Sequence, residues 1–427
     1  MEITMTAYLL IPYFVIILFK KIDFIFYNLV FFSAFTSVSI FNLGRASSIT
    51  AYQIISLILF LKFSFLVLTK RINFKVKIRK SLLVFVIICG LSILLIPYKS
   101  KFIVLSPNDI YENVRFSIQN ITQYCYLIIS YIVYFITYIL FSNNIINIKK
   151  TFKILGISFV CVLTLGIFQL IIPTNEFNLI FRNAVYVNDQ YFLGRPRLAS
   201  VNAEASILAL FITPIIAMYL TIFRANIKIK YLILALLGII IGIVSNSSGF
   251  YLGIFIYLLA DIVLLKRKKN GKIAIKKIIV YYITVVIFII GVFLFRDLIT
   301  EGIVSLFDKI TGKHVSGVGR GNAFINQMQV FSQNLIFGIG FGTTKSYDLF
   351  STWLVQVGIL GFSMYFAYIL KSIIILKKKN PSLMMLILIT NVVLLVSVSN
   401  FTYNYIWIYY GLADYIIFSK DIIKQQN

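Results

Sequence analysis

Two arginines and a glutamate stand close together just before a long apolar run. Arg195 and Arg197 are two residues apart, and Glu204 comes shortly before uncharged residues that continue to Phe223. Guanidinium groups bind phosphate and carboxylate groups through paired N–H donors. Charged groups cost free energy where a chain enters a membrane, so charged residues at such a position usually have a function or a partner. The pattern predicts an anion clamp of Arg195 and Arg197, with Glu204 orienting one guanidinium.

Glu204 also has a purely structural explanation. Pro196 favours an extended backbone before it, and Ser200 or Asn202 can cap the helix that follows. Glu204 would then lie in the first helical turn, where the helix dipole favours a carboxylate, and would pair with Arg197. The sequence leaves both explanations open.

A second polar segment, 296–350, contains further candidates for chemistry: Arg296, His314, Arg320 and Asp348. Arginines bind anions, and an aspartate or a histidine can act as a base. His314 is the single histidine of the chain, and the three cysteines all fall inside apolar runs. The sequence therefore predicts no metal site, and no nucleotide-binding glycine motif is present.

The region around Arg320 predicts a particular local structure. Glycines in 317–321 suggest a flexible approach to Arg320, and 322–331 reads as an amphipathic helix with Phe324, Met328 and Phe331 on one stripe. Such a stripe packs against a bundle or lies at a membrane interface. The glycine-rich segment 336–342 predicts a close turn that leads into the next helix.

The composition indicates a membrane protein, so membrane helices must position these residues. Of the 427 residues, 60% are hydrophobic and 13% are charged, against about 25% charged in soluble domains. Apolar blocks recur along the chain, each long enough to cross about 30 Å of hydrocarbon. We expect one all-α, polytopic membrane domain over 1–427, with about 12–13 helices, an outer loop at 173–200 and a large outer loop at 296–350. The predicted blocks are 5–19, 24–43, 49–68, 82–97, 121–141, 154–172, 201–223, 231–244, 250–265, 278–295, 351–370, 383–398 and 403–418.

The distribution of positive charge predicts the orientation of this bundle. The net charge is +26, but the lysines cluster in short loops between apolar blocks, which is the pattern of a cytoplasmic-membrane protein and not of a nucleic-acid-binding one. This places the C-terminus in the cytoplasm. The block 5–19 lacks a basic leader and a cleavage site, so we expect a retained helix. The side of the N-terminus stays open, because the first two blocks could form a hairpin or re-entrant pair.

The type of cation differs between the two predicted sides. The predicted cytoplasmic loops hold 27 of the 40 lysines and arginines, of which four are arginines. The predicted outer loops hold 12, of which seven are arginines. Topology alone does not require arginine, whereas binding phosphate or carboxylate on the outer side does favour it. The seven outer arginines are Arg45, Arg115, Arg182, Arg195, Arg197, Arg296 and Arg320.

Two segments resemble motifs of the O-antigen polymerase and O-antigen ligase superfamily. The segment 195–206 (RPRLASVNAEAS) is similar to the family's outer-loop motif, an arginine followed by a Glu-Pro-Ser-like helix start, with Ala205 in place of the proline. The segments 320–342 and 354–361 (LVQVGILG) are similar to its second motif, with an arginine, an amphipathic helix, a Gly-x-Gly turn and a Gly-x-x-Gly span. The chain has Tyr347 and Asp348 where ligases commonly have His-Asn, which favours the polymerase branch. The segment 247–249 lacks the arginine of a third family motif, so nothing catalytic is assigned there.

The resemblance implies transfer of a growing glycan from undecaprenyl pyrophosphate to a repeat unit on the same carrier, without a metal or nucleotide cofactor. It implies that Arg195, Arg197 and Arg320 bind the pyrophosphates, and that Glu204 or Asp348 orients an arginine or acts as a base. The candidate partners are membrane lipid, a chain-length regulator and a flippase. The wider set of candidate substrate-binding residues adds Arg182, Arg296 and His314.

Two alternative functions are weighed against a polymerase. A ligase-type glycan transferase would act on the same lipid-linked donor. A flippase for that lipid-linked sugar would be a transporter, and transporters usually show internal repeats and charges near the bilayer midplane. Here the charges gather at the ends of the apolar blocks, which disfavours transport.

Overall fold

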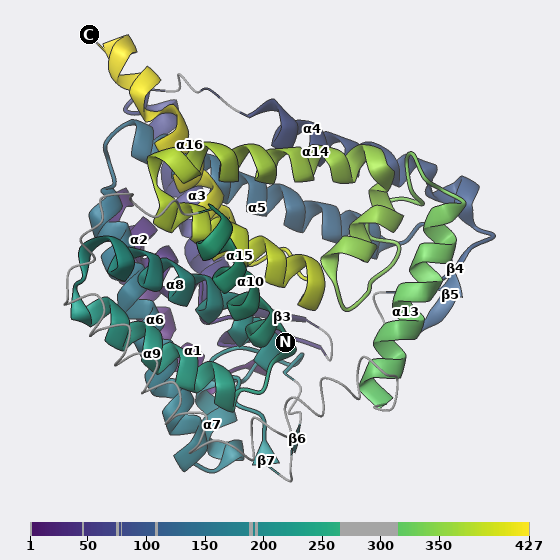
Figure 1. Cartoon of the computed structure of the whole chain (residues 1–427), viewed down its shortest axis with the longest axis horizontal. Helices are drawn as coiled ribbons and strands as arrows, with labels where there is room; N and C mark the ends of the chain where they lie inside the picture. Colours follow the sequence, from purple (N-terminus) through teal and green to yellow (C-terminus); the bar gives the residue numbers. More distant parts are fainter. Residues whose placement is uncertain are drawn as a thin grey trace.

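The computed structural model describes residues 2–44, 47–73, 77, 79–106, 110–187, 191–192, 195–264 and 315–426. Apolar helices dominate it and run back and forth between two ends (Figure 1). One end carries all the short strands and α13, and we call it the strand end. At the opposite end lie the lysine-containing turns and the C-terminus, and we call it the lysine-rich end.

The helices follow the predicted apolar blocks closely. Six described helices are long and apolar enough to cross a membrane, and five shorter apolar helices accompany them. This architecture is consistent with a helical membrane protein. The predicted block 278–295 and the basic run 266–277 lie outside the described residues. The helices are α1 (Met5–Leu18), α2 (Ile22–Phe32), α3 (Ala51–Leu68), α4 (Lys80–Ser92), the 3₁₀ helix η1 (Ile93–Lys99), α5 (Ile118–Ser142), α6 (Ile148–Ile171), α7 (Thr174–Phe181), α8 (Ala205–Asn226), α9 (Ile229–Val244), α10 (Ser248–Leu264), α13 (Val315–Ser332), α14 (Leu349–Lys379), α15 (Pro381–Ser397) and α16 (Asn404–Gln426).

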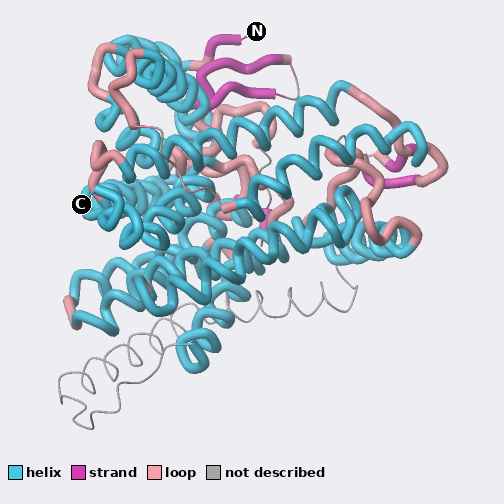
Figure 2. Tube along the Cα trace, turned by 90° about the horizontal axis from the view of Figure 1, so that it is seen from above, coloured by secondary structure: helices cyan, strands magenta, loops and turns pink. Residues whose placement is uncertain are grey.

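Strands interrupt the loops where the sequence predicted none. The predicted block 24–43 is wrong as a single helix, because it splits into α2 and the strand β2. β2 pairs with strands on both sides in an antiparallel sheet of order β1-β2-β3. Figure 2 shows this sheet beside the N-terminus and apart from the β4–β5 hairpin. The strands are β1 (Glu2–Ile3), β2 (Ser39–Leu43), β3 (Ser47–Thr50), β4 (Ile103–Leu105), β5 (Tyr111–Asn113), β6 (Tyr191–Phe192) and β7 (Arg195–Pro196).

The pairing of β1 with β2 places the start of α1 at the strand end. α1 and α2 then form a hairpin that turns at Lys20 and Lys21. At 14 and 11 residues, both helices are shorter than the ~20 residues that a perpendicular span needs. This agrees with the hairpin alternative for the first two blocks.

α8 forms the centre of the bundle. It is the most deeply buried of the six long apolar helices and packs against α9, α10 and α15. Nearly every side chain from Ala205 to Tyr219 is buried, because the helix is apolar on all faces. The loop that carries the predicted anion clamp therefore leads directly into the most enclosed helix of the molecule.

α14 is broken at Gly358, whose backbone is non-helical with φ of +65°. The glycine-rich turn fills the break: Ile339 N–H donates to the Val355 carbonyl (2.9 Å) and Gly340 N–H to the Gln356 carbonyl (3.0 Å). Beyond the break, Ile359 N–H donates to the Leu335 carbonyl (2.8 Å). Backbone groups inside an apolar bundle must be hydrogen-bonded, so the turn replaces the bonds that the break removes. A Cβ at Gly358 would lie 2.2 Å from the Ile336 carbonyl oxygen, which leaves no room for a side chain.

α13 corrects one local prediction. The helix starts at Val315, so the glycines of 317–321 are helical and do not form a flexible approach to Arg320. The face that packs inward carries Ala323, Gln327 and Val330, and Phe331 packs against the same buried cluster as Val330. Phe324 is exposed, and its predicted position at a membrane interface stays a prediction.

A buried ion pair crosses the interior near the lysine-rich end. The Arg79 Nε lies 3.0 Å from the Asp414 carboxylate, and both side chains are buried. Arg79 also donates to the Ser372 hydroxyl (2.8 Å) and the Tyr368 carbonyl (3.2 Å), and the Tyr134 hydroxyl donates to Asp414 (2.7 Å). The sequence grouped Arg79 with the solvated charges of a basic loop, and that assignment is wrong because a carboxylate from α16 draws it inside.

Candidate functional site

Arg197 is anchored by the polar break between α9 and α10. Its Nη2 donates to the backbone carbonyl of Asn246 at 2.7 Å. Asn246 has a positive φ of 47°, an uncommon backbone conformation that asparagine tolerates better than most residues. From the sequence, nothing catalytic was assigned to the segment 247–249 of this break. Its backbone instead fixes the position of one of the predicted anion-binding arginines.

The electrostatic surroundings of Arg197 bring three predicted site residues together. Burial lowers the pKa of the Arg197 guanidinium, and the nearby charge of Arg320 lowers it further. The Glu204 carboxylate and the Tyr251 hydroxyl act in the opposite direction. Two guanidinium groups and one carboxylate from separate segments of the chain therefore share one partly enclosed region at the strand end.

Arg320 reaches this region from α13. Its guanidinium carbon lies 5.2 Å from the centre of the Tyr347 ring, a cation–π arrangement. The next residue, Asp348, caps α14: its carboxylate accepts from the Ser351 backbone N–H (2.7 Å) and from the Ser351 hydroxyl (2.8 Å). The Ser346 hydroxyl donates to it as well (3.1 Å). The structure therefore gives Asp348 a capping function, and its predicted catalytic part stays a prediction.

Glu204 is the residue at which α8 begins. It holds the N-cap position with an extended backbone, and its carboxylate accepts a hydrogen bond from the Ser206 hydroxyl at 3.1 Å. Its carboxylate makes no capping bond to the helix backbone. The side chain is half-buried at the strand end. The prediction that Ser200 or Asn202 caps the helix, with Glu204 in its first turn, is therefore wrong, because Glu204 itself is the N-cap. The predicted pairing of Glu204 with Arg197 and its predicted part in chemistry stay predictions.

Arg182 holds the loop that precedes Glu204. Its side chain is buried, and Nε and Nη2 donate to the carbonyls of Asn202 and Ala203, each at 3.0 Å. Nη1 donates to the Asn178 side chain at 3.2 Å. These contacts position Glu204 through the backbone, and we treat Arg182 as a positioning residue of the loop.

The buried Tyr403 is an electrostatic neighbour of Glu204, and further tyrosines act on Tyr403. Burial raises the pKa of Tyr403 well above its ordinary value, and neighbouring Tyr52, Tyr186 and Glu204 add to this. The Tyr186 hydroxyl donates to the Thr36 carbonyl at 2.7 Å. These phenols stay protonated near neutral pH and offer neutral hydrogen bonds beside the charged groups.

The predicted site residues divide into three groups. Arg197, Arg320 and Glu204 come together, while Arg182 and Asp348 support the backbone around them. Arg296 and His314 lie outside the described residues, and only the backbone of Arg195 is described, in β7.

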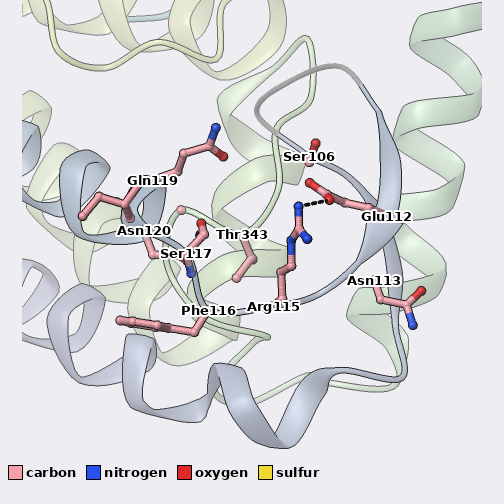
Figure 3. A pocket seen from close by; sticks show the side chains of 11 residues that line it. Ser106, Glu112, Asn113, Arg115, Phe116, Ser117, Gln119, Asn120 and Thr343 are labelled. Atoms are coloured by element: carbon pink, nitrogen blue, oxygen red, sulfur yellow. Dashed lines mark hydrogen bonds and ion pairs between the residues drawn. The ribbon is translucent and has the colours of Figure 1, made fainter.

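Two cavities open nearby at the strand end. The first has a volume of about 300 Å³, and Figure 3 shows Arg115 turned toward Glu112 across it, with an ion pair of 2.7 Å. Arg115 thus has a carboxylate partner on its own loop and is largely exposed. The second cavity, of about 250 Å³, lies between α5, the glycine-rich turn, α14 and the loop before α16. It is lined by Gln123, Tyr126, Phe341, Gly342, Thr344, Lys345, Thr352, Gln356, Ser399, Asn400, Phe401 and Thr402.

This arrangement suits an anion with more than one negative charge. Two guanidinium groups can hold a pyrophosphate while Glu204 keeps one of them oriented. In the described part of the chain, no three His, Cys, Asp or Glu side chains are grouped as metal ligands would be. Comparison with known proteins adds no further evidence, because no protein-family model and no curated protein matches the chain.

Three residues of this region were missed from sequence. Asn246 contributes a backbone carbonyl, which no side-chain pattern reveals. Tyr251 and Tyr403 sit among many other tyrosines of the apolar blocks, so nothing in the sequence distinguishes them. Gln356 was missed as well, although a polar residue inside an apolar run could have pointed to a functional position.

Proposed function

We propose that the chain is a membrane polymerase that joins lipid-linked oligosaccharide repeat units into O-antigen, capsular or other exported polysaccharide. The carrier is undecaprenyl pyrophosphate. The strand end faces the outer side of the cytoplasmic membrane, and the lysine-rich end faces the cytoplasm, in accord with the preference of lysine for cytoplasmic loops.

The observation that carries this proposal is that the charges of Arg320 and Glu204 both act on the partly buried Arg197, so the three groups lie in one region. The two arginines are more than a hundred positions apart in sequence, yet the charge of Arg320 lowers the pKa of Arg197. Like charges repel, so a fold that brings them together gains from an anion between them. A lipid pyrophosphate at the membrane boundary has the required charge and location.

The transfer balances without any other reactant. An acceptor hydroxyl attacks the anomeric carbon of the donor sugar and forms the new C–O bond. The bond between that carbon and the pyrophosphate oxygen breaks, and the lipid pyrophosphate leaves with the electron pair. Arg197 and Arg320 stabilise the charge that develops on the leaving group. Glu204 takes the hydroxyl proton as general base.

The direct test replaces Arg197 or Arg320 with alanine in the full-length protein and measures glycan chain length in cells. We expect loss of long chains, because removal of one donor to a developing charge costs about 10²–10³ in rate. Arg115→Ala is the matched control: it removes an arginine from the same end of the bundle, but one that is exposed and paired with Glu112.

Membrane insertion is measured in parallel from the amount of protein in the membrane fraction. Normal chain-length ladders from both Arg197→Ala and Arg320→Ala would overturn the proposal. The pattern in a deletion strain separates the rivals: a polymerase deletion leaves single repeats, whereas a ligase deletion leaves finished polymer on the carrier lipid.

A further inference from the structure

The second cavity at the strand end differs in chemistry from the arginine site. Its lining combines side-chain amides from Gln123, Gln356 and Asn400 with the aromatic rings of Tyr126 and Phe401. Amides both donate and accept hydrogen bonds, and aromatic faces cover apolar C–H groups. This combination fits a ligand that is rich in hydroxyl groups but has apolar faces, which describes a sugar ring, and Lys345 adds one cation to the lining. The volume of about 250 Å³ is below the ~300–1,000 Å³ of pockets for drug-sized ligands, so the cavity suits a small group.

A buried amide oxygen in the lining is left unpartnered. The Gln356 side chain is 4% exposed, and its Oε1 has no hydrogen-bond partner among the described residues. The amide of Gln356 cannot simply be reversed, because its Nε2 donates to the carbonyl oxygen of Thr344 at 2.5 Å and that oxygen can only accept. A buried acceptor without a donor is costly and calls for an explanation. A ligand hydroxyl in the cavity would supply the missing donor.

The break in α14 holds Gln356 at this position. The residue belongs to the last turn before Gly358, and its carbonyl accepts from Gly340 N–H at 3.0 Å. Both the backbone and the side chain of Gln356 are therefore bonded to the segment from Gly340 to Thr344. Its Oε1 is a fixed acceptor, which gives a binding site directional selectivity.

The cavity adjoins a residue that lies within electrostatic range of Glu204. Thr402 lines the cavity, and the following residue, Tyr403, is close enough to Glu204 to feel its charge. Tyr126, also in the lining, raises the pKa of Tyr186 through its charge. A glycan whose reacting end lies at Glu204 would extend over this loop into the cavity.

We infer that this cavity binds one sugar ring of the glycan, with Gln356 as a hydrogen-bond acceptor for a sugar hydroxyl and Tyr126 as an apolar wall. The inference rests on the proposed function, because that function supplies the glycan. It assigns recognition of the sugar to a place separate from recognition of the pyrophosphate.

The test measures two ligands on the same purified full-length protein in lipid nanodiscs. One probe is the host's own repeat-unit oligosaccharide, freed from its lipid by mild acid. The other is geranyl pyrophosphate, which carries the anion without the glycan. The variants are Gln356→Met, which keeps size but removes the acceptor, and Tyr126→Leu, which changes a half-exposed wall residue. Gln329→Met is the matched control, since Gln329 is exposed on α13 and does not line the cavity.

We expect oligosaccharide binding to weaken about tenfold or more in Gln356→Met and Tyr126→Leu. Geranyl pyrophosphate should bind these two variants as it binds the unchanged protein, and Gln329→Met should bind both probes normally. Thermal unfolding identifies a variant that is misfolded, and Tyr126→Leu then decides the question.

The two probes fail independently. Oligosaccharide binding that is absent from the unchanged protein, or unaffected in both cavity variants, overturns the sugar site. Absence of geranyl pyrophosphate binding, or binding that survives Arg197→Ala and Arg320→Ala, counts against the proposed function.

Discussion

Arg79 and Arg197 are both shielded from solvent, but the charges of their neighbouring groups differ. Arg79 faces the Asp414 carboxylate at 3.0 Å, and serine and backbone oxygens take further donors. Arg197 is anchored by one carbonyl and has a second guanidinium, Arg320, among its neighbours. The interior pair is balanced by the protein itself. In the part of the strand end that the structure describes, a second positive group, Arg320, and the carboxylate of Glu204 both act on Arg197.

This difference shows how to separate structural from functional arginines. The buried pair joins the start of α4 to α16, and its two charges neutralise each other. Two guanidinium groups that lie near each other favour an anion between them. The predictions below test whether the two regions follow this division, in order of decreasing expected effect.

The largest effect is expected from Asp414→Ala. The change leaves the buried Arg79 without its counter-charge, which costs about 3–5 kcal/mol in the free energy of unfolding. Thermal unfolding of the purified protein and the amount in the membrane fraction measure this. Glycan synthesis per folded molecule should stay unchanged.

The double variant Arg79→Met with Asp414→Leu is the control, because it removes both charges and keeps apolar volume. We expect it to recover much of the lost stability. If Asp414→Ala instead abolishes synthesis at an unchanged unfolding temperature, the buried pair is functional and the division between the two regions is wrong.

A smaller effect, on activity alone, is expected from Glu204→Gln. The amide can still accept from the Ser206 hydroxyl but cannot take a proton or balance a guanidinium. We expect about a 10²-fold lower rate of polymer formation with an unchanged unfolding temperature, since a general base contributes at least about that much. A normal rate would show that Glu204 serves only as the start of α8. Glu112→Gln changes a carboxylate at the same end of the bundle and is the matched control.

The smallest effect is expected from Asp348→Ala. The carboxylate caps α14 through the Ser351 backbone N–H, and loss of such a cap costs about 1 kcal/mol. Asp348→Asn should keep most of this stability, because asparagine is also a good cap. Thermal unfolding of the two variants checks the order. A large loss of synthesis in Asp348→Asn at unchanged stability would make Asp348 the base in place of Glu204.

The positions of the long helices could be predicted because hydrocarbon thickness imposes a length on apolar runs. The expected block 49–68, for example, became α3 over Ala51–Leu68. β2 could not be predicted, since its residues continue the apolar run of α2 and only pairing with β1 and β3 makes them a strand. The early start of α13 was missed because its glycines are typical of flexible segments. In the structure the helix extends through them.

The site could be predicted where a charged side chain stands at the entrance of an apolar run. Arg197 and Glu204 gave this signal, whereas Arg320 was singled out as an arginine of a predicted outer loop. The charges of Arg320 and Glu204 both act on Arg197, and a functional site of these three residues stays a prediction. The support around them could not be predicted, because the Asn246 carbonyl and the Arg182 contacts depend on folding between distant loops. Gln356 looked like part of an ordinary helix until the break at Gly358 placed it in a cavity lining.

The glycine-rich turn in the break of α14 also has a mechanical consequence. α13 carries Arg320 near one end, and the chain leaves its other end to enter the turn that is hydrogen-bonded to Gln356. α13, the turn and the broken part of α14 therefore form a continuous connection between Arg320 and Gln356. If α13 moves when an anion binds or leaves, the movement would reach the cavity, so release of the carrier lipid and binding of the glycan would be coupled.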